Sequence, residues 1–174
     1  FPRFEDCPGL APDQLCYLFR IDEEEFFLCP GADAPPPQGF LFVENEVFRH
    51  GLRPKAHAFA GLTALQVARW YRDNRFCGRC GGPMRHSARE RMVLCPRCGN
   101  TVYPKISPVV IVGVRDGENL LMTRYAGRSY GGYALIAGFI EVGEPPEDAA
   151  RREAFEEPGL RIKNLSYCAS QPWG

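Results

Sequence analysis

Four of the eight cysteines are arranged in two close pairs, and this spacing constrains the fold more than any other feature of the chain. Cys77 and Cys80 form one C-x2-C pair, fourteen residues follow, and Cys95 and Cys98 form the second pair. Each pair can present two thiolates from one tight turn, and two such turns complete a tetrahedron around Zn2+ at about 2.3 Å per sulfur. Four sulfur ligands leave no open position, so we expect one structural zinc ion per chain.

An alternative interpretation of these cysteines is a pair of redox dithiols. A redox dithiol needs only one C-x2-C pair and a thioredoxin-like βαβ context, which the sequence lacks. His86 lies between the two pairs, and we expect it to be a surface residue and not a further zinc ligand. The other four cysteines are scattered, which favours metal binding over a disulfide framework: Cys7, Cys16, Cys29 and Cys168.

A second constraint is the acidic helix predicted from Pro145 to Glu157. At about 100° per residue, Glu153, Glu156 and Glu157 fall on one helical face in consecutive turns. Like charges at this spacing repel each other and destabilise a helix, and a hard divalent cation relieves the repulsion. Oxygen ligands of this kind select Mg2+ or Mn2+. A solvated acidic face without a metal is the alternative.

The residues around this helix favour a metal site over a solvated face. Arg152 stands beside Glu153 and can pair with Glu144, which would fix the preceding loop on the helix. We expect Gly138 and Gly143 to form a flexible turn before the helix.

The patterning divides the chain into three predicted segments, namely residues 1–61, 62–104 and 105–174. The first is expected to be a β-rich domain with short apolar runs at 15–20, 25–29 and 40–43, interrupted by a proline-rich loop at 30–39. The second is expected to contain an amphipathic helix over 62–74, capped by Thr63, followed by the cysteine cluster.

The third segment alternates predicted strands with the acidic helix, which is typical of an α/β domain. A β-branched run at 108–115 and a strand at 119–125 are expected to form a hairpin around the turn at 116–118. Further strands are predicted at 133–137 and 160–169. About 70 residues follow the cysteine cluster, too few for a complete sandwich, so we expect an incomplete domain.

Charge and hydrophobicity narrow the class of protein. With 174 residues, of which 45% are hydrophobic, the chain can bury a core. No run approaches the ~18 consecutive apolar residues of a membrane span, and the first residues lack a signal-peptide pattern, so we expect a cytoplasmic protein with no membrane partner.

Residues 49–105 hold 12 basic and 2 acidic residues, a net charge of +10. This block could attract phosphates, or it could neutralise residues 1–48, whose net charge is −8.

The segment from Gly138 to Leu160 resembles the Nudix signature, G-x5-E-x7-R-E-U-x-E-E-x-G-U, at every fixed position. The preceding cysteine cluster and the later Ser170-Gln171-Pro172-Trp173 motif narrow the resemblance to the NADH pyrophosphatase family, also known as the NAD-capped RNA decapping hydrolases. The resemblance extends from about residue 62 to residue 173, and it is faint before residue 62. It implies a Nudix α/β/α sandwich with a mixed sheet, preceded by a zinc ribbon.

The resemblance also implies roles for individual residues. Catalytic Mg2+ or Mn2+ would be held by Glu153, Glu156, Glu157 and the carbonyl of Ala137, and the zinc by the four paired cysteines. Tyr103 and Phe139 would contact substrate, although each taken alone would more often be a core aromatic. The full set of implied substrate contacts is Glu90, Tyr103, Phe139, Gln171, Pro172 and Trp173.

The implied activity is hydrolysis of the pyrophosphate bond of NAD(H), giving NMN(H) and AMP, or removal of the NAD cap from RNA. A homodimer is implied as well. One alternative is a Nudix hydrolase of another nucleoside diphosphate derivative such as ADP-ribose, and another is an inactive module that binds RNA or a protein.

Two departures from the family pattern are Pro158, which removes an N–H near the helix end, and Gly174, where the motif normally continues with proline.

Overall fold

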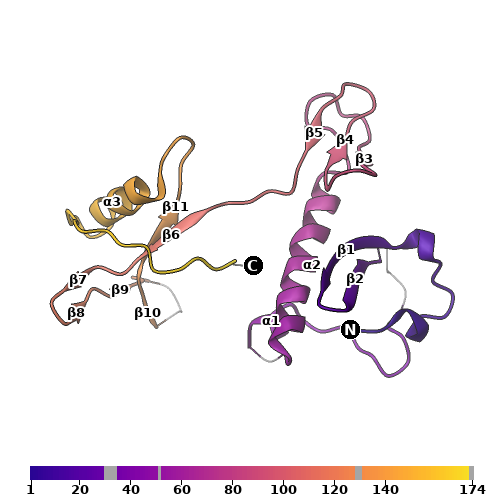
Figure 1. Ribbon diagram of the computed structural model, residues 1–174, viewed down its shortest axis with the longest axis horizontal. Coiled ribbons are helices and arrows are strands. Elements are labelled where there is room, and N and C mark those ends of the chain that lie inside the picture. The colour runs from indigo at the N-terminus through magenta and orange to yellow at the C-terminus, as the bar shows by residue number, and fades with distance from the viewer. Residues whose placement is uncertain (30–34, 51, 128–130, 173–174) are drawn as a thin grey trace. The chain divides into compact units, whose positions relative to one another are not determined.

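The computed structural model describes residues 1–29, 35–50, 52–127 and 131–172 (Figure 1). These residues divide into two compact units, Phe1–Lys105 and Ile106–Gln171. Among the described residues, no helix combines the length and the apolar character needed to cross a membrane. The three-segment division expected from the sequence stays a prediction.

The first unit begins with a β-hairpin. Two short 3-10 turns, Phe4–Asp6 (η1) and Pro12–Gln14 (η2), precede strand β1 (Cys16–Ile21), which pairs antiparallel with β2 (Glu24–Leu28). The two strands match the first two predicted runs. The third run is not a strand: residues 40–43 are exposed coil, because no strand pairs with them in the described part of the chain. Residues 35–39 of the proline-rich stretch are non-regular as expected, and 30–34 lie outside the described residues.

A long helix follows the hairpin. The short helix α1 (Val47–His50) precedes α2 (Lys55–Asp73), which begins seven residues before the predicted start at Leu62. The capping role expected of Thr63 was therefore wrong. The reason is the alanine-rich stretch before residue 62, since alanine has the highest helix propensity. Gly61 is tolerated inside the helix because the Phe48 ring fills the space that a Cβ would take.

The cysteine-rich segment forms a three-stranded antiparallel sheet next to the end of α2. Its strands are β3 (Arg85–His86), β4 (Val93–Leu94) and β5 (Thr101–Val102), in the order β3-β4-β5. The core of this unit joins three elements, because Leu18 of β1, Trp70 of α2 and Val93 of β4 are buried in one cluster. In Figure 1 the hairpin lies along one stretch of α2 and the small sheet lies at its end.

The second unit is built from three two-stranded antiparallel pairs. Strand β6 (Val109–Val112) pairs with β11 (Ile136–Phe139), β7 (Arg115–Asp116) with β8 (Asn119–Leu120), and β9 (Thr123–Arg124) with β10 (Tyr133–Ala134). The predicted turn is confirmed at residues 117–118, whereas Asp116 belongs to β7. The strands that flank the turn are shorter than expected, because β6 ends at Val112 and pairs with β11, not with 119–125. No parallel pairing occurs among the described residues, and the α/β class is confirmed.

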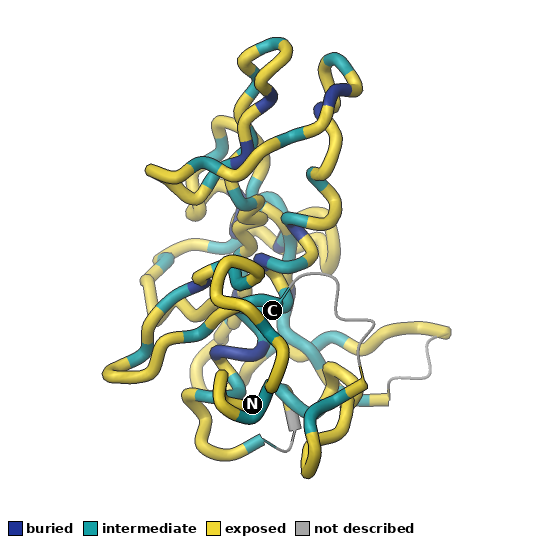
Figure 2. The backbone as a smooth tube through the Cα atoms, turned by 90° about the vertical axis from the view of Figure 1, so that its right-hand side faces the viewer, coloured by how far each residue is buried: buried dark blue, intermediate teal, exposed yellow. Residues whose placement is uncertain are grey.

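Helix α3 (Pro146–Glu156) covers the β6–β11 pair and matches the predicted acidic helix to within one residue at each end. Its inner face carries Ala150 and Ala154, which pack on Val112 and Ile136. The strand predicted at 160–169 is not formed, since no strand pairs with this segment among the described residues, and Asn164 within it adopts a left-handed conformation (φ 54°). Buried stretches are short and separated along the backbone (Figure 2).

Candidate functional site

The four paired cysteines form one compact group. The ligand atoms of Cys77, Cys80, Cys95 and Cys98 all lie within 4.8 Å of one another, and among the described residues they are the only such group of metal-binding side chains. The two turns have matching geometry: Gly81 N–H donates to the Cys77 carbonyl at 2.8 Å, and Gly99 N–H to the Cys95 carbonyl at 2.9 Å. The predicted grouping of the four cysteines is confirmed, and exposed His86 lies outside the group.

The surroundings of these cysteines shift the pKa values of their thiols. Burial raises the pKa of Cys77, but N–H groups of Arg79 and Cys80 that donate to its sulfur outweigh burial and lower the pKa to about 6. At Cys80 the Gly82 N–H lowers the pKa, whereas the neighbouring thiols raise it more strongly, to about 12. Zinc binding would require all four cysteines as thiolates, so the remaining thiol protons would be released.

The acidic helix is organised around one arginine. Arg152 donates from Nε to Oε1 of Glu144 at 2.8 Å and from Nη2 to Oε2 of the same residue at 2.9 Å, so the pair is bidentate. The predicted Arg152–Glu144 pairing is therefore confirmed. Nη1 of Arg152 also reaches Glu153 at 2.7 Å and Glu156 at 3.2 Å, and Nη2 donates to the Phe139 carbonyl at 2.9 Å. One guanidinium links the end of β11, the loop and the helix.

Glu144 is held as a carboxylate by this network. The hydrogen bonds from Arg152 are the main cause, the backbone N–H of Glu141 adds to them at 3.0 Å, and together they lower the pKa of Glu144 to about 2. Gly143 makes the tight turn possible with a φ of 83°. The loop before the helix is therefore fixed on α3 by charge-assisted hydrogen bonds.

Gly138 has a different role from the one expected. It lies inside strand β11, opposite Val110, and is not part of the turn before the helix. A Cβ at this position would overlap the carboxylate of Glu153. The side chain of Glu153 is only 13% exposed and lies against the strand where glycine leaves room. A glycine inside a strand often marks a close approach of another group, and here that group is the Glu153 carboxylate.

The three helix glutamates differ in their surroundings. Glu153 is nearly covered and paired with Arg152, whereas the Glu156 side chain is 58% exposed and Glu157 is exposed as the C-cap residue of α3. The chain turns back at the end of the helix: the Leu160 N–H donates to the Ala154 carbonyl at 2.9 Å, and Gly159 before it has a left-handed φ of 76°. The helix thus ends in a turn that accommodates Pro158.

The expected substrate contacts fall into separate groups. Tyr103 donates its hydroxyl hydrogen to Glu90 at 2.6 Å, which brings these two residues together. This bond raises the pKa of Tyr103 above its ordinary value. Tyr103 is 54% exposed and Phe139 is 65% exposed, so neither is a core aromatic. Ala137 is exposed in β11; Gln171 and Pro172 are exposed coil, and Trp173 lies outside the described residues.

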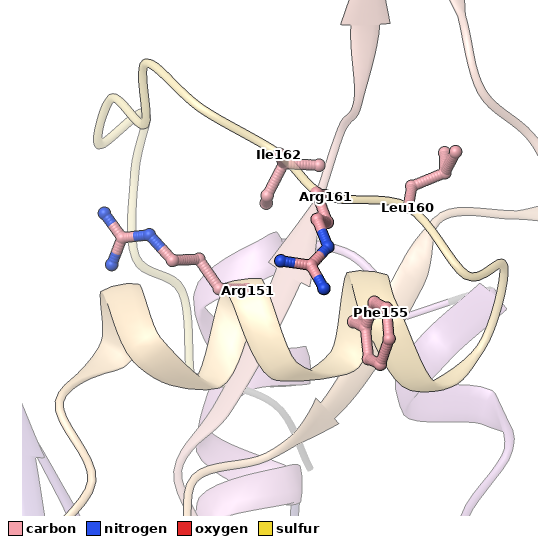
Figure 3. Close-up of a pocket in the computed structure, with 5 residues that line it drawn as sticks. All are labelled: Arg151, Phe155, Leu160, Arg161 and Ile162. Atoms are coloured by element: carbon pink, nitrogen blue, oxygen red, sulfur yellow. The ribbon is translucent and has the colours of Figure 1, made fainter.

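A pocket on α3 was not expected from the sequence. Arg151 and Phe155 of α3 line it together with the chain that follows, and its volume is about 370 Å³ (Figure 3). The remaining lining residues are Leu160, Arg161 and Ile162. Arg151 and Phe155 each stand two residues from Glu153, about 200° around the helix axis. The pocket is therefore on the opposite side of α3 from the glutamate network.

Two segments of the chain match known protein families. Residues 72–103 match the family described as NADH pyrophosphatase zinc ribbon domain, and residues 104–174 match the NUDIX domain family. The NAD-capped RNA hydrolase NudC of Salmonella typhi is 44% identical over 109 residues, which are 63% of this chain and 42% of that protein. The protein of the same name from Photorhabdus laumondii is also 44% identical over 109 residues, with the same coverage.

A crystal structure of a NUDIX hydrolase from Nitrosomonas europaea aligns with 48% of this chain and 50% of that chain, at 28% identity and a TM-score of 0.40. The chain spans 42% of the length of the curated relatives described above. Taken together, residues 72–103 are similar to NADH pyrophosphatase zinc ribbon domains, and residues 104–174 are similar to NUDIX domains.

Proposed function

We propose that this chain carries the catalytic helix of an enzyme that hydrolyses the pyrophosphate bond of NAD(H), giving NMN(H) and AMP, or removes the NAD cap from RNA. The observation that carries the proposal is the Arg152 network, which fixes Glu144 and Glu153 on either side of one guanidinium. The zinc ribbon and the similarity to proteins named NAD-capped RNA hydrolase support it.

The chemistry of the proposed donor set suits a hard divalent cation, whereas the three helix carboxylates do not lie within 4.8 Å of one another in the described structure. Glu153, Glu156, Glu157 and the Ala137 carbonyl offer only oxygen atoms, and two of the three carboxylates are open to solvent. Oxygen ligands favour Mg2+ or Mn2+ over softer metals. A bound ion of this kind would neutralise charge on the diphosphate and lower the pKa of a water molecule.

The protein's own residues would position the reacting groups. Arg152 orients Glu153 through its Nη1 hydrogen bond, and Glu144 keeps Arg152 in place because it stays ionised far below neutral pH. Glu156 or Glu157 would serve as the general base, since both are exposed at the end of the helix. Arg152 is thus a positioning residue that links the loop to the helix.

Substrate recognition would depend on exposed aromatic and acidic side chains. Phe139 is 65% exposed at the end of β11 and could stack on the nicotinamide ring. The hydrogen-bonded pair of Tyr103 and Glu90 in the ribbon unit would offer a polar contact to the substrate. The segment Gln171-Pro172-Trp173 would offer a further contact. The basic block at 49–105 would attract the phosphates of the dinucleotide or of RNA.

The test compares the parent protein with Glu157→Gln in the presence of NADH and Mn2+, with AMP measured by chromatography. Glu147→Gln is the matched control, because it makes the same change in the first turn of α3. We expect AMP from the parent and from the control but almost none from Glu157→Gln. Equal product from all three proteins would remove the proposed role of Glu157.

A substrate panel separates this proposal from its rivals. Preference for ADP-ribose or a diadenosine polyphosphate over NADH and NAD-capped RNA would point to a different Nudix specificity. Absence of all hydrolysis, with zinc bound, would favour a binding module. We also propose that the protein is a cytoplasmic homodimer, which light scattering after size-exclusion chromatography and cell fractionation would test.

A further inference from the structure

A second pocket lies within the first unit, where the end of α2 meets the zinc ribbon. Its volume is about 250 Å³. Tyr71 and Arg75 come from α2 and the residues just after it, Phe76 and Met84 flank the first cysteine pair, and His86 comes from β3. None of these residues is among the proposed metal ligands, the proposed general bases or the individual substrate contacts.

The pocket offers flat aromatic faces that are open to solvent. Phe76 is 66% exposed. His86 stacks on Tyr71 with a centroid distance of 4.2 Å and an interplanar angle of 12°. Tyr71 covers one face of the imidazole, and His86 as a whole residue is exposed. Planar groups such as nucleobases stack on faces of this kind.

A positively charged side chain lies beside the Phe76 ring. The Arg75 guanidinium carbon lies 6.0 Å from the centroid of the Phe76 ring. The wider segment 49–105 has a net charge of +10. Phosphates would therefore be attracted to the rim of the pocket.

We propose that this pocket binds one nucleotide of a single-stranded nucleic acid, with the base stacked on Phe76 or His86 and a flanking phosphate held by Arg75. Aromatic platforms combined with positive charge are the usual means of binding single strands without reading their sequence. The side-chain amide of Asn74, which also lines the pocket, donates to the Trp70 carbonyl at 2.8 Å and caps the helix, so the proposal assigns it no contact with the ligand.

The test measures fluorescence anisotropy of labelled, uncapped oligonucleotides of about 12 residues with the zinc-loaded full chain. RNA and DNA of the same sequence form two arms, since both present bases and phosphates. We expect Phe76→Ala to weaken binding roughly 5- to 100-fold, the effect of losing one stacked base. Phe76→Trp should retain the affinity. Arg75→Ala should weaken binding and reduce the slope of log K against log salt by about 0.7.

Matched controls separate the pocket from general electrostatics. Arg72→Ala removes the same charge one turn earlier on α2, and Phe42→Ala removes an aromatic ring that is 70% exposed elsewhere in the unit. Both should bind nearly as tightly as the parent. A Phe76→Ala protein that binds like the parent, or an abasic oligonucleotide that binds as tightly as the normal one, would overturn the proposal. Because the probes carry no cap, the result is independent of hydrolysis.

Discussion

The carboxylate of Glu153 occupies the space that a side chain on Gly138 would fill. Gly138→Ala should therefore displace Glu153 and disturb its bond with Arg152. We expect kcat/KM for Mn2+-dependent NADH hydrolysis to fall by about 100-fold, because small misplacements of a catalytic group have effects of this size. The added methyl group should also lower the free energy of unfolding by about 1–3 kcal/mol.

Steady-state kinetics and urea unfolding measure the two effects on the same samples. Gly113→Ala is the control, because a Cβ there meets only the Leu120 side chain at 3.5 Å, an ordinary contact. Gly113 directly follows β6, the strand that pairs with β11. Full activity of Gly138→Ala would mean that Glu153 is not needed in its observed position.

The Glu144–Arg152 pair predicts a specific pH dependence of stability. The pKa of Glu144 is lowered from 4.5 to about 2, chiefly by Arg152, so below pH 4.5 the unfolded chain takes up a proton that the folded chain does not. This contribution is complete above pH 4.5 and is lost as the pH falls towards 2. Glu144→Gln should be less stable than the parent at pH 7, and the difference should narrow between pH 4.5 and 2.

Urea unfolding followed by circular dichroism at several pH values measures this difference. Glu147→Gln removes a negative charge from the first turn of the same helix, outside the Arg152 network, and is the control. A constant difference between Glu144→Gln and the parent over the whole acid range would contradict the assigned role of Arg152.

Zinc removal should loosen the first unit, because ribbon and helix share one core. Val93 of β4 packs with Trp70 of α2, and Cys95, the second residue after Val93, is fully buried. We expect one zinc ion per chain by elemental analysis. A chelator should shift the fluorescence of Trp70 to longer wavelength in a Trp173→Phe background, as water reaches the indole ring.

Cys95→Ser should behave like the chelated protein, whereas Cys168→Ser should keep its zinc, because Cys168 is exposed and outside the cluster. Retention of stoichiometric zinc by Cys95→Ser would argue against the four-cysteine site.

Local patterns in the sequence predicted those parts of the site that lie close together along the chain. Helix α3, the four-cysteine cluster and the Arg152–Glu144 pair all depend on spacing within one segment. The role of Gly138 could not be predicted in the same way, because it depends on which strand the helix covers. That information is a property of tertiary packing.

The incorrect predictions have the same origin. The apolar run at 160–169 has strand-like composition, but in the described structure Ile162 and Leu165 pack on the core as coil, and no strand pairs with them. The run at 40–43 fails as a strand for the same reason. Composition indicates that a segment can be a strand, whereas a neighbouring edge decides whether it becomes one. The early start of α2 was missed because the predicted boundary depended on Thr63 as a cap.

The Tyr103–Glu90 hydrogen bond provides a test of substrate recognition in the ribbon unit. Tyr103→Phe and Glu90→Gln each weaken the same 2.6 Å contact, so either substitution should raise the KM for NADH by about 3- to 10-fold. The double variant should be little worse than either single variant, because only one interaction is lost. Tyr17→Phe, which removes a hydroxyl from another half-exposed tyrosine of the same unit, should leave KM unchanged. Additive effects of the two substitutions would mean that Tyr103 and Glu90 contact the substrate independently.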